Sequence, residues 1–322
     1  MTVEKATQNV RQAVIKLKSI IASGNFPNNY ELLELCREYG INLIKTKNEQ
    51  HRVHDLLETA INLFLFEKYS NEAEKNKFAI LAELEDFQQK LSTQTWRDGE
   101  QIIYQQFSTP PALGFVMSQF IRPEKNSTLL EPSAGTGSLA NWLKINGRRA
   151  KVNEISARRR ELLEIQGYKP LAVNAEFLDD LLDPGIKPDF ILMNPPFSSS
   201  GGRAKNRDSS FGFRHVESAL SRLNIGGRLV CLLGAKSCLE TDKGKSFWRM
   251  MGCEYKVRLF LVVPAKTYYK YGTTFQTVIV VIDKPALNQP PGIQNSAEPQ
   301  TIEFCSLKEM LQFSQIFNST NF

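Results

Sequence analysis

Residues 189–197 have the sequence DFILMNPPF, an apolar run that stops abruptly at two prolines. The run has the length and content of a buried strand, and consecutive prolines cannot continue inside a sheet. Asn194 is therefore expected at the carboxyl end of a strand, where open α/β sheets bind their ligands.

The residues that close this stretch suit the recognition of a planar amino group. The Asn194 amide offers one acceptor oxygen, and Pro195 lacks an N–H but keeps its carbonyl. These two acceptors can face the same NH2 group, while Phe197 offers a flat face on which a ring can stack. This arrangement suits a substrate such as adenine; the alternative is a plain strand followed by a proline-rich turn.

A glycine-rich segment lies upstream. Residues 129–139, LLEPSAGTGSL, predict a short strand, a tight turn and a helix. Gly135 and Gly137 allow the backbone to approach a ligand closely. A dinucleotide fingerprint would need a third glycine where Ala140 stands. Phosphate binding is also disfavoured, because Glu131 is an anion and no P-loop lysine follows; an acid here suits a cationic ligand.

Three further segments flank these motifs. Residues 107–113, FSTPPAL, predict a helix start with Thr109 near its cap. A short strand expected over residues 150–155 ends at Glu154, roughly 20 residues past the glycines, where an acid can accept hydrogen bonds from ribose hydroxyls. A third strand, over residues 170–173, leads to Glu176 and Phe177.

Together these segments resemble the amino-group methyltransferases that use S-adenosylmethionine, in particular the N6-adenine DNA methyltransferases. The resemblance covers residues 104–283. Phe-x-Thr-Pro-Pro resembles the cofactor-lid motif of that family, Glu-Pro-x-x-Gly-x-Gly its first motif, and Asn-Pro-Pro-Phe its catalytic motif. Their order along the chain is that of the gamma group.

The resemblance implies a role for each matching residue. Glu176 stands where the family usually has Asp, and it would accept from the adenine amino group of the cofactor. The implied catalytic residues are Asn194, Pro195, Pro196 and Phe197. The implied residues for S-adenosylmethionine are Thr109, Pro110, Glu131, Ser133, Ala134, Gly135, Gly137, Glu154, Glu176, Phe177 and Asn194.

The implied activity is methyl transfer from S-adenosylmethionine to the N6 amine of adenine in DNA, with the base flipped out of the duplex. Two alternatives stay open. One is a methyltransferase that acts on RNA bases or on a protein glutamine, because Asn-Pro-Pro with an aromatic residue also serves those substrates. The other is an inactive nucleic-acid-binding module of the same fold, although the motifs themselves are intact.

Two further groups are candidates for DNA contact. Residues 198–210 form a polar, Gly/Ser-rich stretch in which Arg203, Lys205 and Arg207 would hold phosphates. The alternative is a surface loop with incidental charge. Tyr271 and Phe275, in an aromatic connection between two strands, either help to hold the flipped base or simply pack.

Alternating helices and strands predict an α/β fold of the class I methyltransferase (Rossmann-like) type. We expect a mostly parallel sheet that ends in an antiparallel hairpin and is complete by Ile282, preceded by a small N-terminal helical bundle. The predicted domains are a helical one over 1–95, where nothing shows chemistry, a catalytic one over 96–284, and a Pro-rich linker with a short tail over 285–322. The tail has room for one strand and one helix.

Composition limits the remaining possibilities. The net charge of +6 suits a polyanionic partner. The five scattered cysteines predict reduced side chains, and the three histidines have no metal-site spacing. No signal core or membrane-length apolar run is present, so a cytoplasmic protein is expected, in a bacterial, phage or plasmid context. The short tail predicts that any strong sequence preference comes from a partner protein or an appended domain. The helical N-terminal segment before the lid also resembles that of type I modification subunits and of plasmid- or phage-borne adenine methylases.

Overall fold

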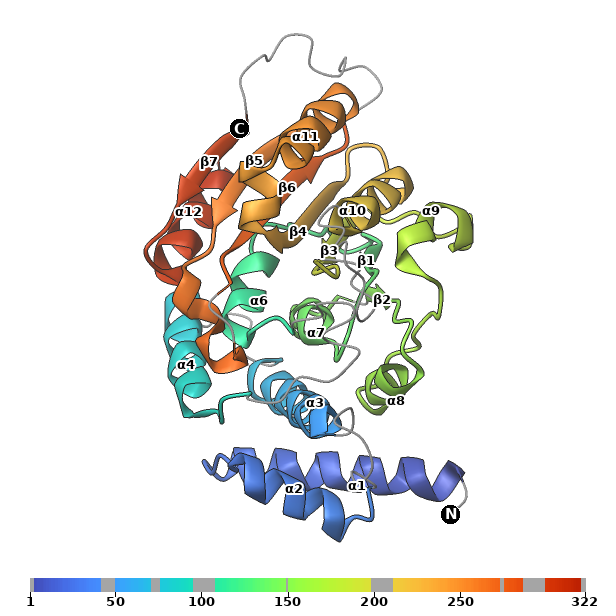
Figure 1. Ribbon diagram of the computed structural model, residues 1–322, viewed down its shortest axis with the longest axis vertical. Coiled ribbons are helices and arrows are strands. Elements are labelled where there is room, and N and C mark those ends of the chain that lie inside the picture. Colours follow the sequence, from blue (N-terminus) through green and yellow to red (C-terminus); the bar gives the residue numbers. More distant parts are fainter. Residues whose placement is uncertain are drawn as a thin grey trace.

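The computed structural model describes residues 3–41, 50–70, 76–94, 108–148, 150–197, 211–272, 275–285 and 299–319. Its centre is a seven-stranded sheet with helices on both faces, and α1, α2 and α3 are stacked at one end of the molecule (Figure 1). The strands are β1 (Leu129–Glu131), β2 (Ala150–Val152), β3 (Phe190–Met193), β4 (Arg228–Gly234), β5 (Lys256–Val262), β6 (Thr277–Asp283) and β7 (Gln300–Glu303).

The strand order across the sheet is β2-β1-β3-β4-β6-β5-β7. Strands β2, β1, β3 and β4 are mutually parallel, whereas β6 runs antiparallel to both β4 and β5. The expected α/β sheet with its antiparallel β5–β6 hairpin is therefore confirmed. The expectation that the fold is complete by Ile282 is wrong, because β7 pairs in parallel with β5 and extends the sheet.

Helices and strands alternate as expected. The helices are α1 (Val3–Ala22), α2 (Asn29–Glu38), α3 (Gln50–Tyr69), α4 (Lys77–Lys90), α6 (Pro111–Ser118), α7 (Ser138–Ile145), α8 (Ala157–Ile165), α9 (Leu178–Leu181), α10 (Phe211–Arg222), α11 (Asp242–Glu254) and α12 (Leu307–Ser319). Short segments of other helical types are η1 (Ala175–Phe177), η2 (Lys236–Glu240) and η3 (Ala265–Tyr271).

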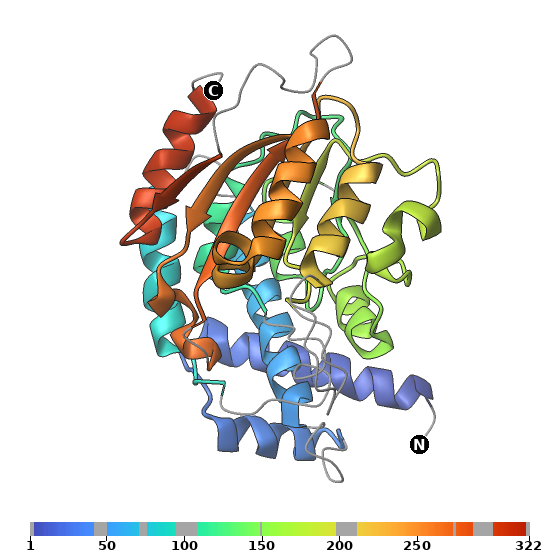
Figure 2. The ribbon, with the colours of Figure 1, turned by 45° about the horizontal axis from the view of Figure 1, so that its top comes forward.

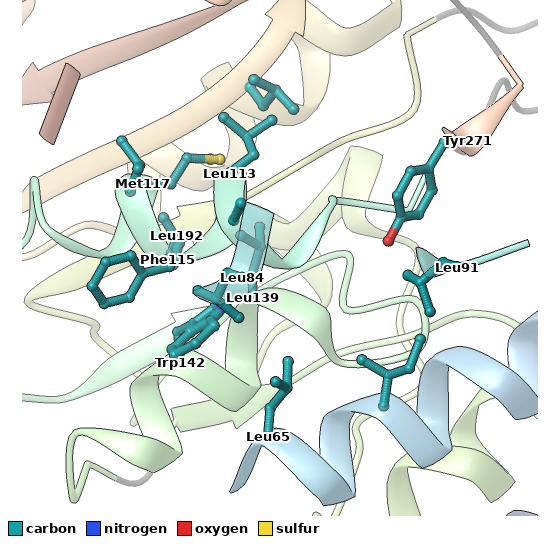
Figure 3. Close-up of a cluster of buried hydrophobic side chains, with 14 of the residues drawn as sticks. Leu65, Leu84, Leu91, Leu113, Phe115, Met117, Leu139, Trp142, Leu192 and Tyr271 are labelled. Carbon is teal, nitrogen blue, oxygen red and sulfur yellow. The ribbon is translucent and has the colours of Figure 1, made fainter. Parts of the chain in front are cut away.

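Successive strand residues point to opposite faces of the sheet and divide the core into two layers. In β3, Ile191 and Met193 belong to the layer under α10 and α11, which lie side by side over the sheet in Figure 2. Leu192 points the other way and joins a second layer. That layer also contains side chains of α3, α4, α6 and α7, some of which Figure 3 labels, and further side chains of α12. The N-terminal helices thus share one hydrophobic core with the sheet.

The third expected strand, over residues 170–173, is reduced to a single bridge between Asn153 and Leu171. The Asn153 side chain explains this. Its Nδ2 donates to the Pro132 and Val173 carbonyls at 2.9 Å, and its Oδ1 accepts from the Val173 N–H at 2.9 Å. A side-chain amide therefore takes the place of ladder hydrogen bonds, and β2 ends at Val152 rather than at Glu154.

The C-terminal helix α12 packs against the sheet and against α6. The Phe317 ring lies 6.0 Å from that of Phe120, and the Arg228 guanidinium lies 4.9 Å over the Phe317 ring. Asn318 Nδ2 donates to the Gln119 carbonyl at 2.6 Å. The strand and helix expected in the tail are both present, and both add to the body of the fold.

Candidate active site

A pocket of about 320 Å³ opens at the carboxyl ends of β1, β2 and β3. This is the edge of an open parallel sheet at which ligands bind, and the volume is in the range of small-molecule sites. Most of the residues implied for cofactor or substrate meet there. The pocket is lined by Thr109, Glu131, Ser133, Ala134, Gly135, Glu154, Glu176, Asn194 and Pro196.

The glycine-rich turn needs its glycines for two different reasons. Gly135 has φ of 56° and Gly137 has φ of 88°, in the left-handed region that other residues rarely adopt. Gly135 lines the pocket. Gly137 starts α7, and a Cβ placed on it would lie 2.9 Å from Leu163 Cδ2. Gly135 therefore lets the backbone approach a ligand, and Gly137 lets α7 pack against α8.

Glu154 fixes the glycine-rich turn to the end of β2. Its Oε2 accepts from the Gly135 N–H at 2.7 Å, and its Oε1 accepts from the Ser156 N–H at 2.8 Å. Burial raises the pKa of this carboxyl, while the nearby Arg159 guanidinium and the two backbone donors oppose the rise. Glu154 therefore shapes the pocket as well as lining it.

Glu131 is also buried, at the end of β1, but its hydrogen bonding differs from that of Glu154. Among the described residues, its Oε2 has no hydrogen-bond partner. Burial raises its pKa well above the usual value, and the neighbouring Glu154 adds to the rise. A buried carboxyl oxygen without a partner is unfavourable unless a ligand supplies one. Its position in the pocket wall suits a cationic donor.

Asn194 follows β3 directly, as expected. Its Nδ2 donates to Thr109 Oγ1 at 3.0 Å, which joins the lid motif to the catalytic motif 85 residues later. This bond uses one N–H of the amide and restrains the orientation of the Asn194 side chain. Phe197 is buried and stacks on Phe275, with ring centroids 5.9 Å apart and an interplanar angle of 23°. The structure thus brings together two aromatic residues that were singled out separately.

Other implied residues lie outside the pocket wall. Tyr271 is buried in the same apolar cluster as Leu91 (Figure 3), so it packs in the core. Phe177 is 48% exposed and is not part of the lining.

Pro110 precedes α6, and its carbonyl accepts from the Gly114 N–H at 2.9 Å. Pro195 is buried next to Asn194 but does not line the pocket, and Arg203, Lys205 and Arg207 lie outside the described residues.

Glu176 lines the pocket but has a partner that the sequence did not suggest. Arg214 Nη1 lies 2.9 Å from Glu176 Oε1, and the Arg214 side chain is 47% exposed. The next residue of α10, His215, also lines the pocket. Burial and the adjacent Arg214 charge lower the pKa of His215 to about 4, so this imidazole is neutral at physiological pH.

Arg159 corrects a further expectation. The run Arg158–Arg160, read from the sequence alone, predicts either a solvated basic helix face or a nucleic-acid contact, but Arg159 is buried and lines the pocket. Its Nη2 lies 3.5 Å from Asp55 Oδ1, and Arg158 Nη2 lies 3.1 Å from Asp55 Oδ2. The cause of this burial is an acid on α3, 104 residues earlier in the chain, so no local sequence pattern could have indicated it.

Two other site classes gain no support from the described part of the chain. It contains no group of three His, Cys, Asp or Glu side chains arranged to hold a metal ion. None of its helices combines the length and apolar character needed to cross a membrane.

No protein-family model matches the sequence, and no curated protein matches it either. Solved structures do match. A modification subunit assigned to a type I restriction enzyme from Vibrio vulnificus is 13% identical, with a TM-score of 0.50; the match covers 91% of this chain and 62% of that one. The chain thus spans less than two thirds of that subunit.

Two other structures match at similar identity. A protein of Listeria monocytogenes assigned to the class I S-adenosylmethionine-dependent methyltransferases is 14% identical, with a TM-score of 0.49 and 98% of both chains covered. A methyltransferase subunit of a type I restriction-modification system from Streptococcus thermophilus is 13% identical, with a TM-score of 0.49, covering 93% of this chain and 72% of that one. With the strand order described above, the match to the Vibrio subunit shows that this chain has the class I methyltransferase fold.

Proposed function

We propose that the chain transfers the methyl group of S-adenosylmethionine to the exocyclic N6 amine of adenine in DNA. The observation that carries this proposal is the Asn194–Thr109 hydrogen bond at the carboxyl end of β3, in a pocket that also holds a buried Glu131 oxygen with no hydrogen-bond partner among the described residues. The Asn194 amide suits a planar amine, and the Glu131 oxygen suits a cationic ligand. The fold and the name of the similar Vibrio subunit agree with this assignment.

The pocket residues fit S-adenosylmethionine better than a phosphate ligand. When bound, this cofactor supplies an electrophilic methyl group on a sulfonium. Glu131 would accept from its ammonium group, and the remaining lone pairs of Glu154 would accept from its ribose hydroxyls. Arg159 is a cation in the pocket wall, but it is paired with Asp55 and so offers no open phosphate site.

On the substrate side, Asn194 Oδ1 and the Pro195 carbonyl would accept from the two N–H groups of the target amine. These bonds favour a pyramidal nitrogen, whose lone pair is less delocalised into the ring and more nucleophilic. Thr109 holds the Asn194 amide in the orientation that presents Oδ1. The rate gain then comes from positioning and charge complementarity. The methylated nitrogen would be cationic and would release one proton to water, so no dedicated general base is needed.

In duplex DNA the target base must leave the stack, which is unfavourable by a few kcal/mol. Stacking against the Phe197–Phe275 pair would offset part of this. Arg203, Lys205 and Arg207 are proposed to hold neighbouring phosphates. If they do, neutralising all three lowers the slope of log affinity against log salt by about 2–3 units. An unchanged slope would assign that segment to a connector role.

The test of substrate class is incubation of the purified chain and labelled S-adenosylmethionine with duplex DNA, RNA or a protein extract. The Asn194→Ala variant serves as the matched blank in each reaction. We expect N6-methyladenine in DNA from the wild type alone. Label in RNA bases or in a glutamine side chain, with none in DNA, would replace the DNA assignment by the corresponding alternative.

We also propose that strong sequence preference comes from a partner protein or an appended domain. A specific protein–DNA surface usually buries roughly 1,000 Å² or more of protein. The strand and helix that follow residue 298 are used instead to extend the sheet and pack against it. Methylation of random duplexes by the purified chain tests this proposal. A defined motif of about four base pairs or more, methylated without a partner, would contradict it.

A further inference from the structure

Helix α3 carries a polar face that is buried rather than solvated. The face consists of Asp55, Glu58 and Asn62, spaced i, i+3 and i+7, and each is at most 5% exposed. Figure 1 shows α3 between the α1–α2 pair and the helices α7 and α8. The α3 polar face is therefore directed at elements that form the pocket, although the sequence indicated only a structural helix.

Glu58 joins two separate walls of the pocket. Its Oε2 accepts from Ser108 Oγ at 2.6 Å and from Thr136 Oγ1 at 2.8 Å, and its Oε1 accepts from Gln94 Nε2 at 2.8 Å. Ser108 and Thr136 both line the pocket. Ser108 precedes Thr109, the residue that orients Asn194, and Thr136 lies between the two glycines of the turn. One carboxylate thus fixes the spacing of the lid segment and the glycine-rich turn.

The other two residues of the face support the same walls. Asn62 Nδ2 donates to the Thr136 carbonyl at 2.9 Å, and Asn141 Nδ2 of α7 donates to the Asn62 carbonyl at 3.0 Å. Asp55 pairs with Arg159, which lines the pocket beside Glu154. Each member of the α3 polar face therefore contacts the glycine-rich turn or the basic residues after β2.

A purely structural helix would not need such a face. Removing a carboxylate from water is unfavourable, and apolar residues of similar volume often replace buried ionic groups without loss of stability. Burial and the negative charge of Asp55 raise the pKa of Glu58, which is opposed by its three hydrogen-bond donors. Burial of the Glu58 carboxylate therefore lowers the stability of the fold, but its hydrogen bonds align the two pocket walls.

We propose that Glu58 is a positioning residue of the cofactor pocket, and that α3 is part of the active site through its polar face. Glu58 holds the Ser108–Thr109 segment and the turn at Thr136 in the geometry that receives the cofactor. It acts through these residues and touches no reacting atom. The identity of the ligand rests on the proposed function.

The test is calorimetric titration of S-adenosylmethionine into the wild type and three variants. Glu58→Ala removes the acceptor of three hydrogen bonds, so we expect the Kd to rise about tenfold to 100-fold. In Glu58→Gln the amide oxygen can still accept from both hydroxyls, and the Gln94 amide can rotate to offer its oxygen. This variant should therefore recover most of the affinity, as a positioning role through hydrogen bonds requires.

Thr59→Val is the matched control on the same helix. Thr59 is fully buried next to Glu58, but within the described part of the chain its hydroxyl bonds only inside α3, to the Asp55 carbonyl at 2.8 Å. We expect a lower melting temperature and an unchanged Kd. Equal weakening of binding in Thr59→Val and Glu58→Ala would show that any destabilisation of α3 has this effect, and it would overturn the positioning role.

The outcomes separate the two proposals. If the wild type does not bind S-adenosylmethionine, the proposed function fails. If the wild type binds and Glu58→Ala binds equally tightly, the function stands and the inference about Glu58 is wrong. Should Glu58→Ala not fold, Ser108→Ala and Thr136→Val decide, because each removes one donor: weaker binding in both supports the role, and wild-type affinity in both refutes it.

Discussion

The two halves of the sheet are built for different purposes. Strands β2, β1 and β3 are parallel and have only three, three and four residues. Strands β4, β6 and β5 contain antiparallel pairs and have seven residues each. Parallel strands all end at the same edge of a sheet, so the residues that follow them meet in one place. Glu131, Glu154 and Asn194 meet in this way.

The antiparallel half uses its residues for packing. All of β6 except Asp283 is buried, and its side chains alternate between the two core layers. Its main contribution to the site comes from just before β6, where Phe275 reaches Phe197. We therefore expect substitutions in the two halves to have different effects. Those after the short parallel strands should change ligand binding or turnover, and those within the long strands should change the stability of the fold.

The largest expected effect is that of Asn194→Ala on turnover. The lost hydrogen bond to the target amine is strongest as charge develops on that nitrogen, so turnover should fall about 100-fold or more. The resemblance also places Asn194 at the cofactor, but its proposed hydrogen bond is to the substrate amine, so binding of S-adenosylmethionine should be nearly unchanged. Steady-state rates and calorimetry on the same preparation measure both quantities. Wild-type turnover in this variant would remove Asn194 from the catalytic role.

Glu131→Gln is expected to move binding and stability in opposite directions. Loss of the negative charge should weaken S-adenosylmethionine binding about tenfold to 100-fold, as expected for a hydrogen bond to a charged group. The ligand-free chain, in contrast, should become more stable at neutral pH, because the variant no longer buries an ionisable carboxyl in the pocket.

The pH dependence gives the sign of the stability effect. The folded-state pKa of Glu131 lies well above the usual 4.5. The protonated carboxyl therefore makes its full contribution to folding stability below pH 4.5. It is lost as the pH rises from there through the raised pKa, since only the unfolded chain releases the proton readily. The melting temperature of Glu131→Gln should exceed that of the wild type by an amount that grows with pH. A constant difference from pH 4 to pH 8 would contradict the assignment.

The sequence was informative where chemistry depends on neighbouring residues. The acceptors of Asn194 and Pro195, the two glycines and Glu131 lie within short motifs, because a turn and its ligand contacts are local features. The existence of β3 likewise followed from its apolar run and the prolines that end it. These motifs, together with the order of helices and strands, were sufficient for the fold class.

The sequence was less informative where burial depends on tertiary position. Asp55, Glu58 and Asn62 have the spacing of a solvated helix face, and only the placement of α3 against α7 and α8 buries them. Strand β7 is largely exposed at the sheet edge, so a strand was expected in the tail but its pairing with β5 could not be predicted. The Asn153 side chain replaced a predicted strand pairing, which no propensity expresses.

A smaller effect is expected for Glu154→Ala. This change removes the acceptor of the Gly135 and Ser156 N–H groups as well as the proposed ribose contact. Affinity for S-adenosylmethionine should fall about tenfold, because solvent can enter and partly satisfy the freed donors. Calorimetry measures the change. Unchanged affinity would reject Glu154 as a cofactor residue and leave it only the role of holding the turn.

The smallest effects come from the same substitution made once in each half of the sheet. Ile282 in β6 and Ile191 in β3 are both fully buried in the layer under α10 and α11. Ile→Val at either position should lower the free energy of unfolding by about 0.5–1.5 kcal/mol, since one buried methyl group is lost. Chemical denaturation of both variants checks this common loss.

Turnover should distinguish the two variants. Ile191 lies three residues before Asn194, so relaxation of β3 around the missing methyl group shifts the amide that faces the substrate, and small displacements of a positioned group reduce the rate. Ile282 lies at the far end of β6 from the segment that carries Phe275, so Ile282→Val should retain wild-type turnover despite its lower stability. Equal loss of turnover in both variants would mean that the sheet transmits strain across β4, and that its two halves are not independent.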